Sequence, residues 1–310
     1  MDFLIYGGTR FIGKKVVDNL LASGHQVTVI SRREASPHPQ LTSIKTERED
    51  SYGRLADMHF DCIIDFMAYD VNAVEAAVGL MPKTLYVFVS TAWIDVYKTG
   101  ARRFLSLEEN YVRKKIEAEA FLENICRHSR KAIICRLPIT IGADDHSERF
   151  KFYTTRLLAN KGLILPGGGN SKTRIAFRDD VAAAVSALVV CNDPCEETIY
   201  DVLPDAEISL AEYVSLIAKG LGVEAKILEL EPDFIEGVYP GFLDKEPLWR
   251  EGSYSLSHQN LFEKTQVPVT SYREWISVLC GLSEMRSLSG KNAFLRSDVM
   301  LREQGLLKRL

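Results

Sequence analysis

The stretch that decides the fold is Asp2-Phe-Leu-Ile-Tyr-Gly-Gly-Thr-Arg-Phe-Ile-Gly13, at the start of the chain. A short apolar run predicts a β-strand over residues 2–6, and the run stops at two glycines. After them, Ile12, Val16 and Leu20 recur at helical spacing. A second apolar run at residues 26–30 predicts another strand. We therefore expect a strand, a tight turn, a helix and a second strand.

A turn of this kind suits a pyrophosphate group, because it gathers backbone N–H groups and the positive end of a helix dipole at one point. Gly7 and Gly8 would let the backbone approach a ligand without a Cβ, and Gly13 would let the helix lie close to the strand. A purely structural turn is the alternative. On the first interpretation a dinucleotide cofactor contacts the whole turn: Gly7, Gly8, Thr9, Arg10, Phe11, Ile12 and Gly13.

The end of the second strand bears on the choice of cofactor. An Asp or Glu at this position would bind the adenosine 2′-hydroxyl, but here Ser31 is followed by Arg32 and Arg33. Guanidinium groups pair well with phosphate, and Arg10 could reach the same region. The pattern favours NADP(H) over NAD(H), and a solvated loop is the structural alternative.

Composition and charge narrow the classes of protein further. A chain of 310 residues is long for one core and suits one large domain or two joined domains. A net charge of -4 gives no general attraction to nucleic acid or anionic lipid. No transmembrane span or signal peptide is expected, so we predict a cytoplasmic protein. The 6 cysteines and 6 histidines show no ligand spacing, and no metal site is predicted.

Strands and helices alternate along the first two thirds of the chain. Further strands are predicted at residues 41–45, 61–67, 84–89, 133–142 and 198–202, and helices at 71–80, 107–128 and 181–190. This alternation predicts a parallel, doubly wound α/β sheet of the Rossmann type. Ala68 follows the fourth strand at its carboxyl end, where ligands of such sheets bind.

The helix after the fifth strand carries a pair of residues with a chemical use. Tyr111 and Lys115 are four residues apart and share a helix face. A cation one turn away would lower the pKa of the phenol, which is about 10 in water. The tyrosine could then exchange a proton with a carbonyl or alcohol, while the hydroxyl of Thr91 or Ser90 hydrogen-bonds the same oxygen. The spacing alone is common, but Tyr111 follows Thr91 by 20 residues, on the next helix.

These features in this order resemble the extended short-chain dehydrogenases. The turn Gly7–Gly13 is similar to the GGTRF-type variants among atypical members. Phe88-Val-Ser-Thr-Ala92 resembles the "FSSSA" stretch of sugar-nucleotide 4-epimerases, and residues 133–142 resemble the "RPxxxxG" strand and turn. Asp179-Asp180-Val181 resembles the "DDVA" helix start. The likeness is to the NAD(P)-dependent epimerase/dehydratase family and covers residues 2–203, and more loosely the chain to residue 281.

The resemblance implies a role for individual residues. Tyr111 would be the catalytic acid/base, Lys115 would lower its pKa and hold the nicotinamide ribose, and Thr91, with Ser90 as substitute, would bind the reacting oxygen. Pro138 and Ile139 would lie beside the nicotinamide.

The remaining chain is expected to form a smaller C-terminal α/β substrate domain. We predict a dinucleotide domain over 1–203, with part of 143–178 contributing to the substrate cleft, and a cap domain with a helical tail over 204–310. Pro166-Gly-Gly-Gly169 is interpreted as a flexible loop over the substrate. Four nearby cations would suit a diphosphate: Arg149, Arg156, Lys172 and Arg174. Residues 283–310 are expected to pack on this chain or on the partner of a homodimer.

Two classes of function stay open. The first is an enzyme acting by hydride transfer on a sugar-nucleotide-like small molecule, as an epimerase or a reductase; a 4,6-dehydratase is disfavoured because Ala92 and Trp93 follow Thr91. The second is a non-catalytic dinucleotide-binding regulator or RNA-binding scaffold, against which the acidic net charge argues. The sequence does not name the substrate, the oligomeric state or the role of residues 283–310.

Overall fold

A computed structural model describes most of the chain: residues 1–81, 83–100, 106–129, 132–159, 162–191, 197–243, 248, 254–282 and 305. The chain divides into two compact units. The first comprises Met1–Thr140, Ala176–Pro204 and Tyr254–Val269, and the second comprises Ile141–Ile175, Asp205–Ser253 and Thr270–Leu310. Both units are built from separate stretches of the chain, and one crossing between them falls between Pro204 and Asp205.

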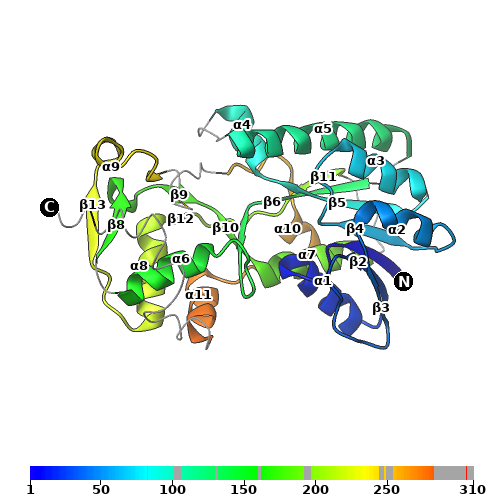
Figure 1. Cartoon of the computed structure of the whole chain (residues 1–310), viewed down its shortest axis with the longest axis horizontal. Coiled ribbons are helices and arrows are strands. Elements are labelled where there is room, and N and C mark those ends of the chain that lie inside the picture. The colour runs from blue at the N-terminus through cyan, green and yellow to red at the C-terminus, as the bar shows by residue number, and fades with distance from the viewer. Residues whose placement is uncertain are drawn as a thin grey trace. The chain divides into compact units, whose positions relative to one another are not determined.

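The first unit is organised around an eight-stranded sheet in the order β14-β11-β6-β5-β4-β1-β2-β3 (Figure 1). Every neighbouring pair in it is parallel. Its strands are β1 (Asp2–Tyr6), β2 (Gln26–Ser31), β3 (Leu41–Lys45), β4 (Cys62–Asp65), β5 (Leu85–Thr91), β6 (Ala132–Leu137), β11 (Ile199–Asp201) and β14 (Gln259–Asn260). The order reverses between β1 and β4, which confirms the predicted Rossmann-type fold.

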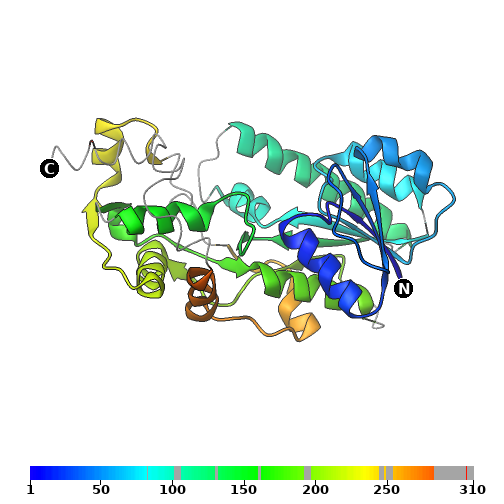
Figure 2. The same ribbon diagram turned by 60° about the horizontal axis from the view of Figure 1, so that its bottom comes forward.

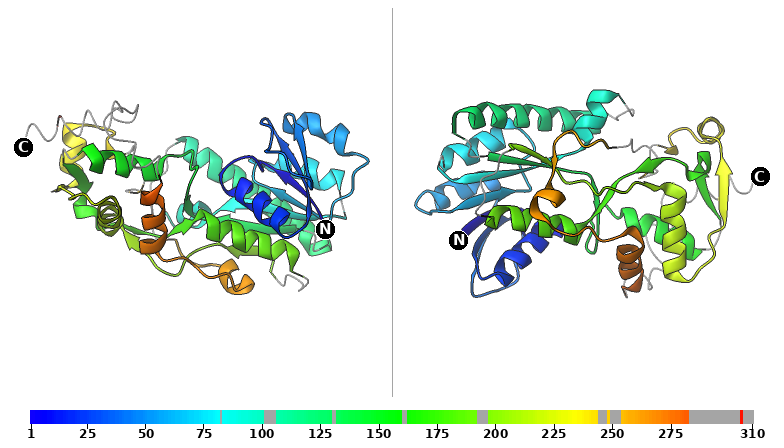
Figure 3. Two further views of the ribbon diagram at one scale, coloured as in Figure 1. Left: turned by 90° about the horizontal axis from the view of Figure 1, so that it is seen from below. Right: turned by 180° about the vertical axis from the view of Figure 1, so that it is seen from behind.

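Helices cover both faces of this sheet, as the apolar central strands require. On one face lie α2 (Arg48–Leu55), α3 (Val71–Leu80) and α5 (Ser106–Ser129). On the other lie α1 (Phe11–Ala22), α7 (Arg178–Val190) and α10 (Leu261–Thr265), and Figure 3 shows the last two side by side. A short helix α4 (Trp93–Thr99), which the sequence analysis did not predict, follows β5 directly.

The second unit packs helices around an aromatic core. Its helices are α6 (Arg149–Ala159), α8 (Leu210–Leu221), α9 (Pro232–Val238) and α11 (Tyr272–Gly281). Helix α8 packs against α6 and α11 (Figure 2). Its strands β8 (Leu163–Pro166) and β13 (Ile227–Leu230) pair in parallel, and β9 (Lys172–Thr173) and β12 (Ile208–Ser209) pair antiparallel. A further pair, β7 (Ile139–Ile141) with β10 (Ile175–Phe177), is formed by the two stretches in which the chain passes from one unit to the other.

Two further expectations concern the second unit. The predicted flexible loop at 166–169 contains a 3₁₀ turn, η1 (Gly167–Gly169), in which Gly169 is buried; a Cβ on it would lie 2.8 Å from the backbone nitrogen of Ala211. The tail 283–310 lies outside the described residues except for residue 305. Among the described helices, none has the length and apolar character needed to span a bilayer.

Candidate functional site

The glycine turn lies at the carboxyl end of β1, between the ends of β2 and β4. Gly7 has a φ of +87°, and its backbone N–H donates to the carbonyl of Ile30 over 3.1 Å. A Cβ on Gly7 would lie 2.6 Å from Cγ of Met67, and a Cβ on Gly13 would overlap the carbonyl oxygen of Gly7. Both positions therefore require glycine, for the close approach that the sequence analysis inferred.

The start of α1 is arranged like a helix N-terminus that receives an anion. Arg10 is the N-cap residue, with an extended backbone and a side chain that makes no capping hydrogen bond. The first turn of α1 carries no acidic residue. Phe11 has a φ of 45°, a left-handed conformation that is unusual for an aromatic residue and concentrates at functional sites. The start of α1, where the N-cap side chain makes no capping hydrogen bond, and the glycine turn together fit a dinucleotide pyrophosphate.

Thr9 and Ser31 are brought together at the end of β2. Their hydroxyl oxygens are 2.7 Å apart, and Ser31 Oγ also accepts a hydrogen bond from the backbone N–H of Arg33 over 3.2 Å. The side chains of Arg10, Arg32 and Arg33 are exposed. The residues that the sequence analysis expected near a 2′-phosphate therefore lie at the carboxyl end of β2 or in the glycine turn beside it.

Thr91, Tyr111 and Lys115 lie together at the carboxyl end of β5. Tyr111 hydrogen-bonds Thr91, and Lys115 Nζ lies 5.8 Å from the centroid of the Tyr111 ring. The Thr91 hydroxyl oxygen also accepts a hydrogen bond from the backbone N–H of Trp93 over 3.2 Å. The three residues whose sequence positions suggested a common site are therefore neighbours in space.

Lys115 is buried and held by backbone carbonyls. Its ammonium group donates to the oxygens of Ala68 and Val89, each over 2.7 Å. It also lies 4.4 Å from the centroid of the Phe88 ring. Burial lowers the pKa of Lys115 to about 8, while the charge of Asp65 acts in the opposite direction.

The pKa of Tyr111 differs from the expectation. Burial of the phenol raises its pKa to about 12, the neighbouring Tyr69 contributes in the same direction, and the hydrogen bond with Thr91 only partly offsets the rise. The predicted lowering by Lys115 is not found, because the carbonyls of Ala68 and Val89 hold its ammonium group and desolvation dominates at Tyr111. Tyr111 is therefore a neutral phenol at physiological pH.

Two aromatic side chains border Tyr111. The ring centroids of Trp93 and Tyr69 each lie 6.4 Å from that of Tyr111, and the Trp93 ring meets it edge-on. Trp93 is itself held by a 2.8 Å hydrogen bond from its indole nitrogen to the Tyr254 hydroxyl. Tyr69 is 48% exposed, which leaves an aromatic surface beside the phenol.

The other predicted residues occupy the same end of the sheet. Ser90 is buried, and its hydroxyl has no hydrogen-bond partner among the described residues. Thr91 is opposite Leu137 in the β5–β6 register, which places Pro138 and Ile139 just beyond it. The carbonyl of Ala68 holds Lys115. These positions fit a nicotinamide ring near Tyr111.

One buried group was not found from the sequence. Asp65, the last residue of β4, accepts two hydrogen bonds from the guanidinium group of Arg48, at 3.0 and 2.5 Å. Asp65 is fully buried, and the Arg48 side chain is 11% exposed. The only sequence signal was an acidic residue at the end of the apolar run Cys62-Ile-Ile-Asp65.

The cations expected to bind a diphosphate have partners within the second unit. Arg174 lies 3.6 Å from Glu207, and Arg149 donates to the Ser147 hydroxyl over 2.7 Å. Arg156 is buried, with its guanidinium carbon 4.7 Å from the Phe152 ring centroid. Of the four, Lys172 is exposed.

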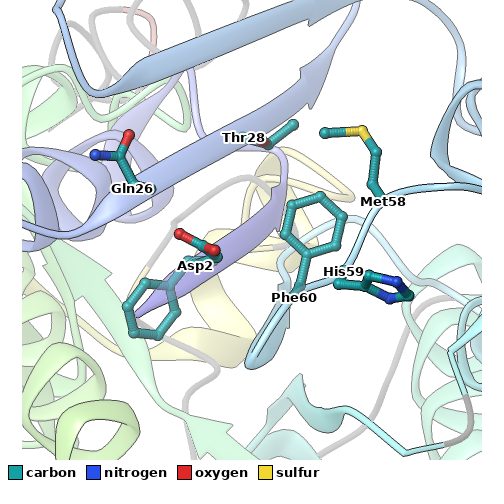
Figure 4. Close-up of a pocket in the computed structure, with 7 residues that line it drawn as sticks. Asp2, Gln26, Thr28, Met58, His59 and Phe60 are labelled. Carbon is teal, nitrogen blue, oxygen red and sulfur yellow. The ribbon is translucent and has the colours of Figure 1, made fainter.

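A hollow of about 200 Å³ lies at the opposite end of the strands, where β1 and β2 begin (Figure 4). Its lining is Asp2, Phe3, Gln26, Thr28, Met58, His59 and Phe60. These residues come from the amino ends of β1 and β2 and from the segment before β4, so the hollow is separate from the glycine turn and Tyr111. Within the described part of the chain, no cluster of three His, Cys, Asp or Glu side chains could hold a metal ion.

Comparison with known proteins supports this assignment of the fold. Residues 3–86 match the NAD dependent epimerase/dehydratase family. The structure is similar to that of UDP-glucuronic acid 4-epimerase from Bacillus cereus in complex with NAD, with a TM-score of 0.70 and 15% identity over 94% of this chain and 100% of that one. The predicted resemblance to the extended short-chain dehydrogenases is confirmed.

Two curated relatives have different activities. The chain is 21% identical to bifunctional pinoresinol-lariciresinol reductase 2 of Linum usitatissimum, over 72% of each chain. It is 23% identical to the chloroplast stem-loop binding protein of 41 kDa b of Arabidopsis thaliana, over 74% of this chain and 66% of that protein. Relatives at this distance leave the particular reaction open.

Proposed function

We propose, from the match of residues 3–86 to the NAD dependent epimerase/dehydratase family and from the likeness in fold, that this chain is an oxidoreductase or epimerase of the extended short-chain dehydrogenase type with Tyr111 as its acid/base. The observation that carries the proposal is the grouping of Thr91, Tyr111 and Lys115 beside the glycine turn. Hydride transfer would take place at a carbinol or carbonyl carbon of the substrate.

The residues of the site would divide the work between cofactor and substrate. The glycine turn and the start of α1 would hold the pyrophosphate, and Ala68, Lys115, Pro138 and Ile139 would border the nicotinamide. When bound, the nicotinamide supplies or accepts the hydride. Thr91, with Ser90 next to it, would hydrogen-bond the reacting oxygen and orient it toward Tyr111.

Tyr111 suits the role of proton donor in the reductive direction. Its pKa of about 12 keeps the phenol protonated at neutral pH. The phenol O–H would give its proton to the carbonyl oxygen of the substrate as that oxygen gains negative charge. In the oxidative direction the same oxygen atom would have to accept a proton, so the reaction would require the phenolate, which the raised pKa disfavours.

Replacement of Tyr111 tests this role directly. The Tyr111→Phe variant should bind the dinucleotide normally and lose at least about a hundredfold in kcat, because the phenol is the proposed proton donor. Tyr69→Phe is the matched control, because it removes a hydroxyl from the neighbouring ring and should retain turnover. Normal kcat in the Tyr111→Phe variant would refute the assignment.

The substrate is proposed to be a nucleotide-sugar. The support is the likeness in fold to UDP-glucuronic acid 4-epimerase. UDP- or dTDP-sugars should raise the melting temperature of the cofactor-loaded protein above that found with the free nucleotides. If a broad panel of such sugars gives no rise, the substrate belongs to another class.

The cofactor that co-purifies with the protein would separate epimerase from reductase. Tightly held, oxidised cofactor favours an epimerase, and an empty site that NADPH fills favours a reductase.

A non-catalytic dinucleotide-binding scaffold is the second candidate, supported by the likeness to the stem-loop binding protein. Retention of Thr91, Tyr111 and Lys115 in one site argues for the enzyme.

A further inference from the structure

The ion pair between Arg48 and Asp65 lies directly behind the proposed site and has no part in the chemistry described so far. Asp65 ends β4 and Arg48 begins α2, so the pair joins two elements that the sequence separates. Figure 1 shows α2 and α3 close to the end of this strand. Asp65 is fully buried and the Arg48 side chain is 11% exposed, so the pair differs from exposed surface ion pairs, which contribute little to stability.

The carboxylate of Asp65 organises the loop that follows β4. Its Oδ1 accepts hydrogen bonds from the backbone N–H groups of Met67, over 2.9 Å, and Ala68, over 2.8 Å. Its Oδ2 accepts one from the Tyr86 hydroxyl over 2.7 Å. A buried anion with this many donors is fully satisfied and sets the path of the backbone at residues 66–68.

Arg48 connects the same point to its surroundings. Its guanidinium carbon lies 4.1 Å from the centroid of the Tyr6 ring, at the end of β1. It also donates to the carbonyl of Ala73 over 2.9 Å and to the Tyr52 hydroxyl over 3.1 Å. Arg48 therefore ties together the ends of β1 and β4 and the start of α3.

The path from this pair to Lys115 passes through a single residue. The N–H of Ala68 is bound by Asp65, and the carbonyl of Ala68 accepts a hydrogen bond from Lys115 Nζ over 2.7 Å. Asp65 thereby determines where one of the two carbonyls that hold the ammonium group is located.

The charges around Lys115 act along the same path. Asp65 and Glu119 favour its protonated form, with Asp65 the stronger of the two, and Arg48 disfavours it. The neighbouring Tyr69 and Tyr111 present their rings to the ammonium group, at 5.6 and 5.8 Å. Of the acidic groups, Asp65 is thus the one that most directly keeps Lys115 charged.

A purely structural role would be served better by apolar residues. A buried ion pair contributes no more to stability, as a rule, than well-packed hydrophobic side chains of the same size. The strand run Cys62-Ile-Ile-Asp65 is otherwise apolar, so an aliphatic residue at its last position would continue the core. Stability alone therefore does not explain why a carboxylate, that of Asp65, is placed beside Ala68.

We propose that Arg48 and Asp65 are positioning residues, which hold the loop 66–68 so that the Ala68 carbonyl keeps the ammonium group of Lys115 at the cofactor and at Tyr111. The inference rests on the proposed function for the meaning of Lys115. In the proposed function, neither Arg48 nor Asp65 contacts the reacting atoms.

The experiment follows the titration of Lys115 itself. Lysine labelled with ¹³C at the ε carbon is incorporated, and the Lys115 signal is assigned by its loss in Lys115→Met. In Asp65→Asn the pKa of Lys115 should fall by about 1 unit, since the anion that most favours its protonated form is removed. Dinucleotide binding at pH 8 should weaken by about fivefold, because the protonated fraction of Lys115 falls from about a half to about a tenth.

Asp70→Asn is the matched control in the same loop. Asp70 pairs with Lys114 at the surface, over 3.5 Å, and caps α3 by accepting from Ala73 N–H, which asparagine can also do. This variant should leave the titration of Lys115 and dinucleotide binding unchanged.

If Asp65→Asn does not fold, the double variant Arg48→Met with Asp65→Asn removes both charges and avoids an unpaired buried guanidinium. This double variant should also lower the pKa of Lys115 and weaken dinucleotide binding.

The outcomes separate the inference from the proposed function. A Lys115 pKa in Asp65→Asn, or in the double variant, equal to that of the unmodified protein would overturn the positioning role. A lowered pKa with weakened binding supports it. Unaltered dinucleotide binding in Lys115→Met would instead overturn the proposed role of Lys115 in the site, whatever Asp65→Asn does to the titration.

Discussion

At two positions of the glycine turn, Gly8 and Gly13, neighbouring atoms leave no room for a side chain. A Cβ on Gly8 would lie 2.8 Å from Cγ2 of Val17 and 2.9 Å from Cγ2 of Val29, so this glycine lets α1 and β2 pack against the end of β1. Gly13 is limited by a backbone oxygen, which cannot move aside as the end of a side chain can. Packing within the protein therefore restricts both positions of the turn.

Alanine at Gly13 should therefore destabilise the protein by about 1–3 kcal/mol and weaken dinucleotide binding, because the helix must move away from the turn. Gly79 is the matched control: it lies within α3 and has nothing within 4 Å of a Cβ. Gly79→Ala should stabilise the protein by about 0.5–1 kcal/mol. Urea denaturation and fluorescence titration measure both effects; equal stability of the two variants would contradict this account of Gly13.

At the scale of whole elements, helix α5 shows how phase determines function. Tyr111 and Lys115 lie on the face turned toward β5, and Lys115 is buried against it. Lys114, one position earlier, points to the surface and pairs with Asp70. A shift of one residue in the phase of the helix would replace the buried ammonium group with an exposed one. The four-residue spacing therefore has meaning only with the face that packing selects.

The end of β2 gives a prediction about the cofactor. NADPH should bind more tightly than NADH, because Ser31 is followed by two exposed arginines that can pair with a 2′-phosphate. The double variant Arg32→Gln and Arg33→Gln should reduce this preference by about tenfold or more, an effect of about 1.4 kcal/mol. Arg127→Gln, an exposed arginine on α5, is the control. Equal affinities of the unmodified protein for the two cofactors would remove the argument.

In the first unit as a whole, a polar network that runs from buried Arg136 to exposed Ser257 joins segments that are far apart in the sequence. Arg136 on β6 pairs with Glu119 on α5, over 2.6 Å, and with Asp95 on α4, over 3.0 Å. Ser257, in the segment that returns to this unit, donates to Asp95 over 2.9 Å, and its N–H donates to Asp201 over 2.8 Å. The network holds α4, and with it Trp93, beside the proposed site.

Arg136→Met should destabilise the protein by about 3–5 kcal/mol, because Glu119 is left buried and unpaired. The double variant Arg136→Met with Glu119→Leu should recover much of that loss, since both charges are then removed. Denaturant unfolding, followed by circular dichroism, measures the difference. A double variant no more stable than the single one would show that the pair is not the source of the effect.

The sequence by itself determined the features that local patterns encode. Periodicity predicted the strand, turn and helix at residues 2–22, the parallel sheet and the helix with Tyr111 and Lys115, because burial of strands and helix faces leaves a regular pattern. The position of Thr91 at a strand end was predictable because parallel strands end at one edge of their sheet.

Only the tertiary structure decided what depends on distant partners. Arg48 and Asp65 are separated by 17 residues and share no motif, and their pairing follows from the packing of α2 against the ends of β1 and β4. The return of residues 254–269 to the first unit likewise has no local signal. The pKa values of Tyr111 and Lys115 depend on burial and on carbonyls contributed by other elements, so spacing alone predicted the wrong direction for the phenol.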